Sequence, residues 1–559
     1  MRFISRYFTV IILYLILTLV LTYPLVTRFN TYLAGDDGDG WQNIWNMWWM
    51  KESIVESQRN PYYTDYFHYP SGGTLLFYAM SPFNAVLSIP FQYFFSRITI
   101  YNAIFILAFT FSGFTMYLLA LYLTKNRLAA IVAGFIFTFS PYHMGHGLGH
   151  LFLISMEFIP LFILFLFKAL ETEDTDKYTI LASLFLILVA LCDWYYLFFC
   201  VMFSIFYIAY LLLVRRLAPW APLKKATFIL TSAFIALSPF FIAMAKEALK
   251  GKLLGAHPPE EYSADLLSFF IPSQIQTMGR FCDFFKTISS LFTGNVAENS
   301  NYIGYAVLFL SWYAFKRRGR ESKIVNFFFF SGIIFFILSL GMHLHVMGRI
   351  FGKIPLPYNL LHKTFFFFSF TGVPERFDAM VVVCISLLAG FGLKNLFLME
   401  RNGKRNFIII AAILLIFVEY LCVPFPTTAF EVPRFFETIA NDAQDYAIIY
   451  IPPESRKAFY YQTIHRKKIV WGDIGRYHES SEEFVKSIPI VKHIIWDICP
   501  VEIDNKQIPE RTVRKMARDA FRILKIRYVV IEKGVKNKFI DYYKFIKIYE
   551  DDNIEVYGP

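Results

Sequence analysis

The chain has 559 residues, of which 56% are hydrophobic and 17% charged, and it contains 64 phenylalanines. This composition excludes an ordinary soluble globular protein and indicates a polytopic α-helical membrane protein. The net charge is +11, but the basic residues lie in short runs between apolar segments, so we expect no nucleic-acid partner. The six cysteines have no regular spacing, which argues against a disulfide framework.

The first apolar segment covers residues 7–25 and follows Arg2 and Arg6. Its length predicts a membrane span, and the two arginines place its start in the cytoplasm. No small-residue cleavage site follows it, so we expect an uncleaved signal anchor.

Three carboxylates come shortly after this span, in the loop Gly35-Asp36-Asp37-Gly38-Asp39-Gly40. The glycines allow sharp turns that would bring the carboxylates together. One of them, Asp36 or Asp37, could act as a general base, and Asp39 could join Asp37 in holding Mg²⁺ or Mn²⁺. Because Asp and Gly are common turn residues, a solvated turn is the alternative.

Two segments after the acidic loop are predicted to lie at the membrane surface. Trp41, Trp45, Trp48 and Trp49 recur at helical spacing, which predicts one face of a helix in the aromatic belt. Residues 81–95 are apolar but short and contain prolines, so we interpret them as an interfacial helix instead of a span.

Ten further apolar windows follow, which gives about 11 transmembrane helices in all. We expect them near residues 100–123, 128–142, 150–169, 178–192, 195–214, 226–245, 303–315, 324–341, 379–398 and 406–424.

The basic loops set the sidedness of these spans. With residues 81–95 outside the membrane core, every short and strongly basic loop falls on the cytoplasmic side, as the positive-inside rule requires. The N-terminus is then cytoplasmic, and the acidic loop and the C-terminus are extracytoplasmic. The basic loops are residues 125–127, 168–177, 215–225, 316–323 and 394–405.

The last part of the chain has a different pattern. Residues 434–445 and 514–524 look helical, and residues 447–451 and 528–531 look like strands. We therefore divide the chain into a membrane domain, 1–426, with a large first external loop, 26–99, and a small extracytoplasmic α/β domain, 427–559. The α/β domain has no GxGxxG motif or P-loop, so nucleotide binding is not expected.

Three histidines, His143, His146 and His150, lie in the glycine-rich segment 141–150 on the external side. Their spacing is that of metal ligands, but the glycines argue against the helix on which the three rings would share one face. The alternatives are hydrogen-bond partners for a phosphate or sugar, and interfacial polar residues. His150 is the leading candidate because it opens the following span.

Three more charged residues are candidates on the external side. Asp193 lies at the end of a span among aromatic residues, where an ionisable group is often functional. Glu261 belongs to an acidic run ahead of an apolar stretch, and Arg376 is an exceptional positive charge outside. Arginine binds phosphate oxygens bidentately. The simpler alternatives are an exposed loop acid, a solvated charge run and an interfacial anchor.

Several short motifs resemble those of GT-C membrane glycosyltransferases, which use polyprenyl-phosphate-linked sugars, and in particular the YfhO-like proteins of that superfamily. The motifs are Gly35-Asp36-Asp37, Tyr69-Pro70-Ser71-Gly72-Gly73, Ser140-Pro141-Tyr142, Gly149-His150-Leu151 and Pro374-Glu375-Arg376-Phe377. The resemblance implies a GT-C-like fold, an acidic catalytic base at Asp36 or Asp37, and a lipid phosphate as the leaving group.

These observations favour transfer of a sugar from a lipid-linked donor to a glycan, lipid or protein acceptor at the external membrane face. Arg376 would hold the phosphate, while His146, His150, Asp193 and Glu261 would line the cavity. A transporter or lipid flippase is an alternative, although no inverted repeat is evident. A non-catalytic assembly or binding protein, with its function in the last domain, is another.

Overall fold

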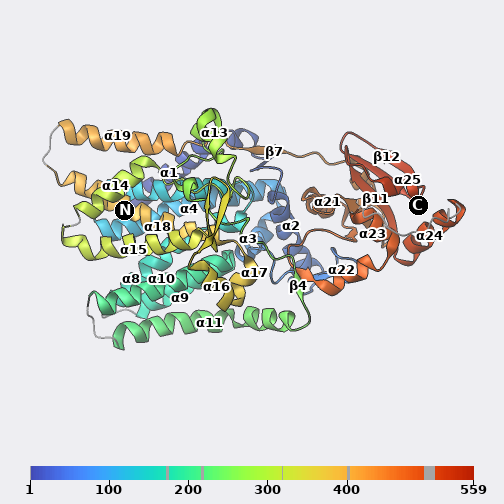
Figure 1. Ribbon diagram of the computed structural model, residues 1–559, viewed down its shortest axis with the longest axis horizontal. Helices are drawn as coiled ribbons and strands as arrows, with labels where there is room; N and C mark the ends of the chain where they lie inside the picture. Colours follow the sequence, from blue (N-terminus) through green and yellow to red (C-terminus); the bar gives the residue numbers. More distant parts are fainter. Residues whose placement is uncertain (1, 172–175, 216–219, 318, 400–402, 497–509) are drawn as a thin grey trace.

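The computed structural model of the protein describes residues 2–171, 176–215, 220–317, 319–399, 403–496 and 510–559. A bundle of long helices forms one end of the molecule and a sheet with surrounding helices forms the other (Figure 1). The start of α1 lies at the end of the bundle away from the sheet. Outside the described residues lie Cys499 and, of the expected basic loops, residues 172–175, 216–219, 318 and 400–402.

Within the described residues, seven helical segments are long and apolar enough to cross a membrane. This identifies a helical membrane protein. The segments are Arg97–Thr124, Arg127–His146, Leu151–Glu171, Trp194–Leu213, Pro222–Ala248, Ser322–Ser339 and Pro374–Phe397. The helices that form them are α4 (Arg97–Thr124), α5 (Arg127–Phe139), α6 (Pro141–His146), α7 (Leu151–Ile154), α8 (Phe158–Glu171), α10 (Trp194–Leu213), α11 (Trp220–Ala248), α15 (Ser322–Ser339) and, after the 3-10 turn η6 (Pro374–Phe377), α18 (Asp378–Phe397).

The other four expected spans are also helices, α1 (Arg2–Leu21), α9 (Asp176–Cys192), α14 (Tyr305–Lys316) and α19 (Gly403–Glu419). Their apolar stretches are shorter than those of the seven segments above. The 12 residues of α14 rise by about 18 Å, which is less than the hydrocarbon core of about 30 Å. The figure of eleven spans therefore stays a prediction.

Residues 81–95 form two short helices, α3 (Pro82–Ser88) and η3 (Ile89–Tyr93), and neither is long enough to span a bilayer. Phe91 and Phe94 expose 47% and 80% of their surface. Their interfacial position stays a prediction.

The last part of the chain contains a five-stranded mixed sheet in the order β12-β13-β11-β8-β9. The central strands β11 and β8 are parallel, as are β8 and β9, whereas β13 pairs antiparallel with β11 and β12. The strands expected at residues 447–451 and 528–531 are confirmed as β8 and part of β11. The strands are β8 (Ala447–Ile451), β9 (Lys468–Ile469), β11 (Ile526–Glu532), β12 (Ile546–Glu550) and β13 (Ile554–Gly558).

Helices surround this sheet. The helix expected over residues 434–445 begins as predicted but ends at Ala440, and the one expected over residues 514–524 begins earlier, at Glu510. The helices are α20 (Arg434–Ala440), α21 (Lys457–His465), α22 (Glu479–Lys486), α23 (Pro489–Trp496), α24 (Glu510–Ile523) and α25 (Lys538–Tyr542).

Two small antiparallel pairings join the sheet region to loops of the bundle. Strand β1 (Tyr32–Ala34) of the first loop pairs with β7 (Thr427–Ala429). Strand β4 (Leu253–Leu254) pairs with β10 (Tyr477–His478). Consequently the last part of the chain is fastened to the loop after α1 and to the segment after α11.

The four tryptophans lie on α2 (Gly40–Lys51) and are at most 3% exposed. Trp45 stacks on Trp49 with ring centroids 5.5 Å apart, and its indole N–H donates a 2.7 Å hydrogen bond to Gln462 Oε1 of α21. The expected aromatic belt is therefore wrong. Helix α2 is buried on all sides, so its apolar faces need protein cover, which α21 provides.

Replacing Trp45 by Ala is expected to lower the free energy of unfolding by about 3–5 kcal/mol, because it removes a fully buried indole and leaves its Gln462 partner without a donor. The matched control is Trp220→Ala, since Trp220 is 82% exposed. The midpoint of thermal unfolding should fall strongly in the first variant and little in the second. Equal midpoints would contradict the packing role of Trp45.

Candidate functional site

The acidic loop rests on the histidine-rich turn. The Asp36 N–H donates a 2.9 Å hydrogen bond to Leu148 O, and the Gly35 N–H donates one of 3.0 Å to Pro426 O. Gly35 has a φ of +107°, and a Cβ there would lie 2.1 Å from Leu148 O. A glycine is therefore required where the loop meets the turn.

Replacing Gly35 by Ala is expected to cost about 1–3 kcal/mol in strain and to displace the acidic loop from the histidine turn. Gly534→Ala is the matched control, because Gly534 also has a positive φ, +87°, but a Cβ there would meet no other atom within 4 Å. Thermal unfolding measures the first effect, and hydrogen exchange of the Asp36 N–H, which donates to Leu148 O, measures the second. An equal loss in both variants would show that backbone conformation alone matters.

The three carboxylates turn to different partners. Asp36 accepts only the Gly38 N–H, at 3.0 Å. Asp37 accepts from the Trp41 indole at 2.7 Å and pairs with Lys457 at 2.8 Å. The glycines therefore do not gather the carboxylates at one point, since separation relieves the repulsion between like charges.

Asp39 has the strongest cationic surroundings of the three. Its oxygens lie 2.9 Å from Arg456 Nε and 3.3 Å from His150 Nε2. Burial acts to raise the pKa of Asp39, but Arg456 and His150 outweigh it and hold the pKa well below its usual range. Asp39 is therefore an ionised anchor and a weak proton acceptor.

Asp36 has different electrostatics. Desolvation by the surrounding protein raises the pKa of Asp36, while His150 and the Gly38 N–H act in the opposite direction. No ion pair joins Asp36 to a basic side chain among the described residues, so its carboxylate is the most available proton acceptor of the loop.

The expected Mg²⁺ or Mn²⁺ site at Asp37 and Asp39 does not fit this arrangement. Lys457 and Arg456 already supply the positive charge that these two carboxylates need. In the part of the chain that the structure describes, no group of three or more His, Cys, Asp or Glu side chains is arranged to hold a metal ion.

The histidine segment begins as a helix, contrary to the expectation from its glycines. Ser140 caps α6 and Pro141 starts it, and the glycines that interrupt it come mainly after His146. The turn brings His146 Nδ1 to 2.9 Å from His150 Nδ1. His143 points elsewhere, because both of its ring nitrogens lie 2.8 Å from backbone carbonyls, those of Thr138 and Ile154. The three rings therefore do not form a zinc site.

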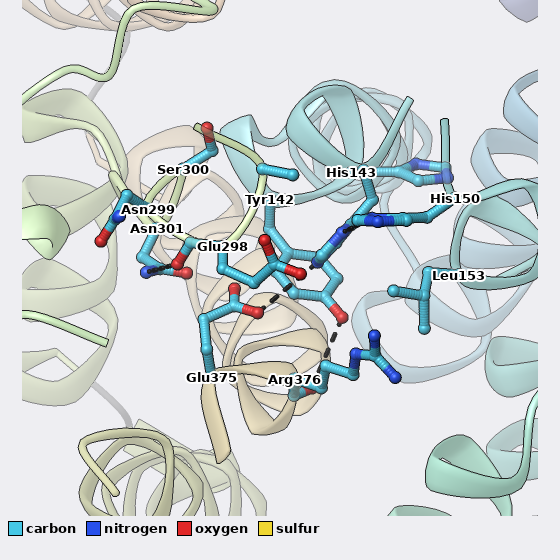
Figure 2. Close-up of polar contacts among 12 residues, drawn as sticks. Tyr142, His143, His150, Leu153, Glu298, Asn299, Ser300, Asn301, Glu375 and Arg376 are labelled. Carbon is cyan, nitrogen blue, oxygen red and sulfur yellow. Dashed lines mark hydrogen bonds and ion pairs between the residues drawn. The ribbon is translucent and has the colours of Figure 1, made fainter. Parts of the chain in front are cut away.

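Two buried glutamates extend this histidine pair. Glu375 Oε2 lies 3.6 Å from His146 Nε2, and both side chains are fully buried. Glu298 is 4% exposed and its carboxyl group points into the same space as that of Glu375 (Figure 2). Among the residues that the structure describes, the Glu375 oxygens and His146 Nε2 have no hydrogen-bond partner. Glu298 carried no signal in the sequence beyond its charge in a segment that we expected to be external.

Arg376 is a buried cation held by aromatic rings. It is 9% exposed, and its guanidinium carbon lies 4.6 Å from the centroid of the Tyr195 ring and 5.6 Å from that of Phe152. Within the described residues, no ion pair or hydrogen bond reaches its guanidinium. Its charge influences Asp39, Asp193 and His150, so the structure brings these sequence-predicted residues into one electrostatic unit.

Asp193 has a structural role as well as a place in the site. One oxygen caps α10 by accepting the N–H groups of Tyr195 and Tyr196, at 2.8 and 3.2 Å. Burial raises the pKa of Asp193 to about 6, although Arg376 and the two N–H groups oppose the shift. Asp193 and Phe152 line a cavity that extends between the loop before α3 and α11.

Glu261 is not brought to this site. Its side chain is exposed, and no hydrogen bond or ion pair joins it to the other candidates within the described chain. The backbone of the next residue contributes instead, because Tyr262 O accepts the Glu375 N–H at 3.1 Å.

The last part of the chain contributes two arginines that were not among the candidates predicted from the sequence. Arg456 follows the carboxyl end of the parallel strand β8, an edge where functional residues often lie, and this was an available signal. Arg476 is 6% exposed and donates to Phe370 O and Thr371 O, at 3.3 Å each. Its charge and that of Arg376 act on each other and on His257, and burial together with the two arginines lowers the pKa of His257 to about 3.

Solved structures with a similar backbone arrangement have low sequence identity to this chain. The Archaeoglobus fulgidus oligosaccharyltransferase tethered to an acceptor peptide is 12% identical over 94% of this chain and 69% of that chain, with a TM-score of 0.49. ArnT from Cupriavidus metallidurans bound to undecaprenyl phosphate is 10% identical over 98% of this chain and 97% of that chain, with a TM-score of 0.47.

A search of curated proteins finds no significant match. The YfhO-like resemblance accordingly stays a prediction. Residues 9–418 match the family model described as a domain of unknown function, DUF6311. Because the match covers most of the chain, the protein belongs to the DUF6311 family.

Proposed function

We propose that this protein transfers a sugar from a lipid-linked phosphate donor to an acceptor at the external membrane face. The observation that carries the proposal is Arg376, a buried guanidinium without an anionic partner in the described chain, close to an acidic loop. Asp193 and Glu298 attract this cation without forming an ion pair with it, and no side chain of the described residues occupies its N–H groups, which leaves them open to an anionic ligand.

The donor phosphate would bind between the membrane domain and the last domain. Arg376 offers its free guanidinium, and Arg476 adds a second buried positive charge close to it. Arginine suits phosphate because its planar fork donates two parallel hydrogen bonds. Phe152, whose ring centroid lies 5.6 Å from this guanidinium carbon, also lines the cavity at Asp193, and the lipid chain would leave toward the bilayer on that side.

Asp36 is the best candidate for the base that removes the acceptor proton. Asp37 is engaged by Lys457 and Trp41, and Asp39 by Arg456 and His150, whereas Asp36 has no cationic partner among the described residues. As the acceptor oxygen attacks the sugar, Asp36 would take its proton and the C–O bond to the lipid phosphate would break. The leaving phosphate would then remain with Arg376.

The test uses the full-length protein in lipid nanodiscs with synthetic farnesyl-phosphoryl hexoses as donors. We expect release of farnesyl phosphate in the presence of an acceptor, and no comparable release from protein-free discs. Asp65→Asn serves as the control for general damage, since Asp65 belongs to the same external loop but pairs with Arg59 at 2.9 Å. No release from any donor, together with intact binding of farnesyl phosphate, would replace the transferase by a binding or flipping function.

A further inference from the structure

Four titratable side chains form a continuous row from the acidic loop into the protein interior. Asp39 Oδ2 lies 3.3 Å from His150 Nε2, His150 Nδ1 lies 2.9 Å from His146 Nδ1, and His146 Nε2 lies 3.6 Å from Glu375 Oε2. The row begins at a partly exposed carboxylate and ends at a fully buried one. Each imidazole therefore has one ring nitrogen toward each end.

The contact between the two imidazoles restricts where their protons can lie. A hydrogen bond between two Nδ1 atoms requires one proton between them, on one ring or the other. If His146 donates, its Nε2 is bare and needs a donor, which only a protonated Glu375 can supply. If His150 donates while its Nε2–H faces Asp39, His150 is an imidazolium and His146 carries its proton on Nε2.

We infer that Glu375, His146 and His150 form a proton relay, in which the buried Glu375 acid delivers a proton to His150 when a phosphate group occupies the space beside Arg376. The Glu375 O–H bond breaks as an N–H bond forms at His146 Nε2. The His146 Nδ1–H bond breaks as one forms at His150 Nδ1. The row keeps its total charge, with a carboxylate left at Glu375 and an imidazolium formed at His150.

The groups that face the relay explain why an anion would trigger it. Asp36, Asp39, Asp193 and Glu298 favour the cationic form of His150, whereas Arg376 opposes it. Burial lowers the pKa of His150, but the hydrogen bond to Asp39 and the charge of Glu298 raise it above its usual value. A phosphate that neutralises Arg376 removes the opposing charge.

The other end of the relay has opposing constraints. Glu298 and Asp378 repel a negative charge on the Glu375 carboxyl group, whereas Arg376 attracts it, so a phosphate that neutralises Arg376 favours the relay through its gain at His150 and not at Glu375. The 3.6 Å separation from His146 is longer than a hydrogen bond, so a small rotation of the Glu375 side chain must accompany transfer. The Glu375 oxygens and His146 Nε2 have no other partner that would prevent this rotation.

This inference rests on the proposed function only for the identity of the trigger, a phosphate on the lipid donor. The test records ¹⁵N nuclear magnetic resonance spectra of the full-length protein, labelled at histidine, in nanodiscs. Farnesyl phosphate and inorganic phosphate are the two probes, and His146→Phe and His150→Phe assign the signals. We expect His146 to change from the Nδ1–H to the Nε2–H tautomer when a probe binds, or when the ligand-free protein is acidified.

Glu375→Gln distinguishes a relay from simple orientation, because glutamine can accept a hydrogen bond but cannot release a proton as an acid does. We expect His146 in this variant to keep one tautomer after farnesyl phosphate binds. Glu157→Gln is the matched control, since Glu157 is a buried acid between α7 and α8 whose charge does not act on His146, His150 or Glu375, and this variant should switch as the wild type does. A wild-type His146 that keeps one tautomer under every condition overturns the relay, as does an unaltered switch in Glu375→Gln.

The outcome also separates the relay from the proposed function. A tautomer switch without any sugar transfer supports the relay and counts against the transferase. Sugar transfer with an unchanging His146 tautomer supports the transferase and overturns the relay. A response to both probes assigns the trigger to the phosphate group, and a response to farnesyl phosphate alone assigns it to the lipid-borne phosphate.

Discussion

Replacing Asp36 by Asn is expected to lower sugar transfer by about 10²–10⁴-fold, the usual contribution of a general base. Asparagine has nearly the same size and can still accept the Gly38 N–H, but it cannot take a proton from the acceptor. Because the group acts in the chemical step, kcat should fall while KM for the donor changes little. Initial rates of farnesyl phosphate release measure both constants.

Two further variants sharpen this result. Asp37→Asn removes a carboxylate that already pairs with Lys457, so its effect on kcat should be smaller than that of Asp36→Asn. Asp65→Asn should behave as the wild type. If Asp37→Asn abolished transfer while Asp36→Asn retained it, the base would be Asp37. The lack of a cationic partner would then not identify the proton acceptor.

Replacing Arg376 by Gln is expected to weaken binding of farnesyl phosphate by about 10- to 150-fold, which corresponds to about 1.5–3 kcal/mol for charged hydrogen bonds. The same change removes a buried charge that has no partner among the described residues, so the midpoint of thermal unfolding should stay the same or rise. Binding and stability should therefore move in opposite directions. Isothermal titration and thermal unfolding of the same preparations measure them.

The controls for Arg376 follow from its geometry. Arg376→Lys keeps the charge but loses the planar fork and its stacking on Tyr195, so we expect only partial recovery of affinity. Arg59→Gln removes an arginine of the loop after α1 that pairs with Asp65, and it should leave affinity unchanged. A parallel loss of affinity and stability in Arg376→Gln would indicate a structural arginine.

Local features of the fold were predictable because they depend on local composition. Apolar windows located the helices of the bundle, and alternation located strands such as Ala447–Ile451. The number of spans was harder to predict, since a short apolar window such as residues 303–315 gives a helix, Tyr305–Lys316, that is shorter than the hydrocarbon core. Sidedness rests on the distribution of basic loops, which the fold alone does not test.

The site was predictable only in part, because its members come from distant segments. Charge and position singled out Asp36, His150, Asp193 and Arg376, and the structure brings these together. Glu261 looked equivalent in sequence yet lies apart, since only the fold determines which loops meet at one site.

The partners of the acidic loop were less accessible from the sequence. Arg456 and Lys457 approach Asp39 and Asp37 because α21 packs on α2, a contact with no local signature. The aromatic belt was predicted wrongly from the tryptophans for the same reason. Their spacing predicted an apolar helix face, but spacing does not say whether lipid or protein covers that face.

The pairing of the first loop with the last domain also sets the order in which the molecule can mature. Asp37 and Asp39 leave the ribosome early, whereas Lys457 and Arg456 are made near the end of synthesis. Until then helix α2 is not covered by α21, and the acidic loop lacks the positive charges of Arg456 and Lys457. A growing chain therefore cannot assemble the site, which would be completed only after every membrane helix has been synthesised.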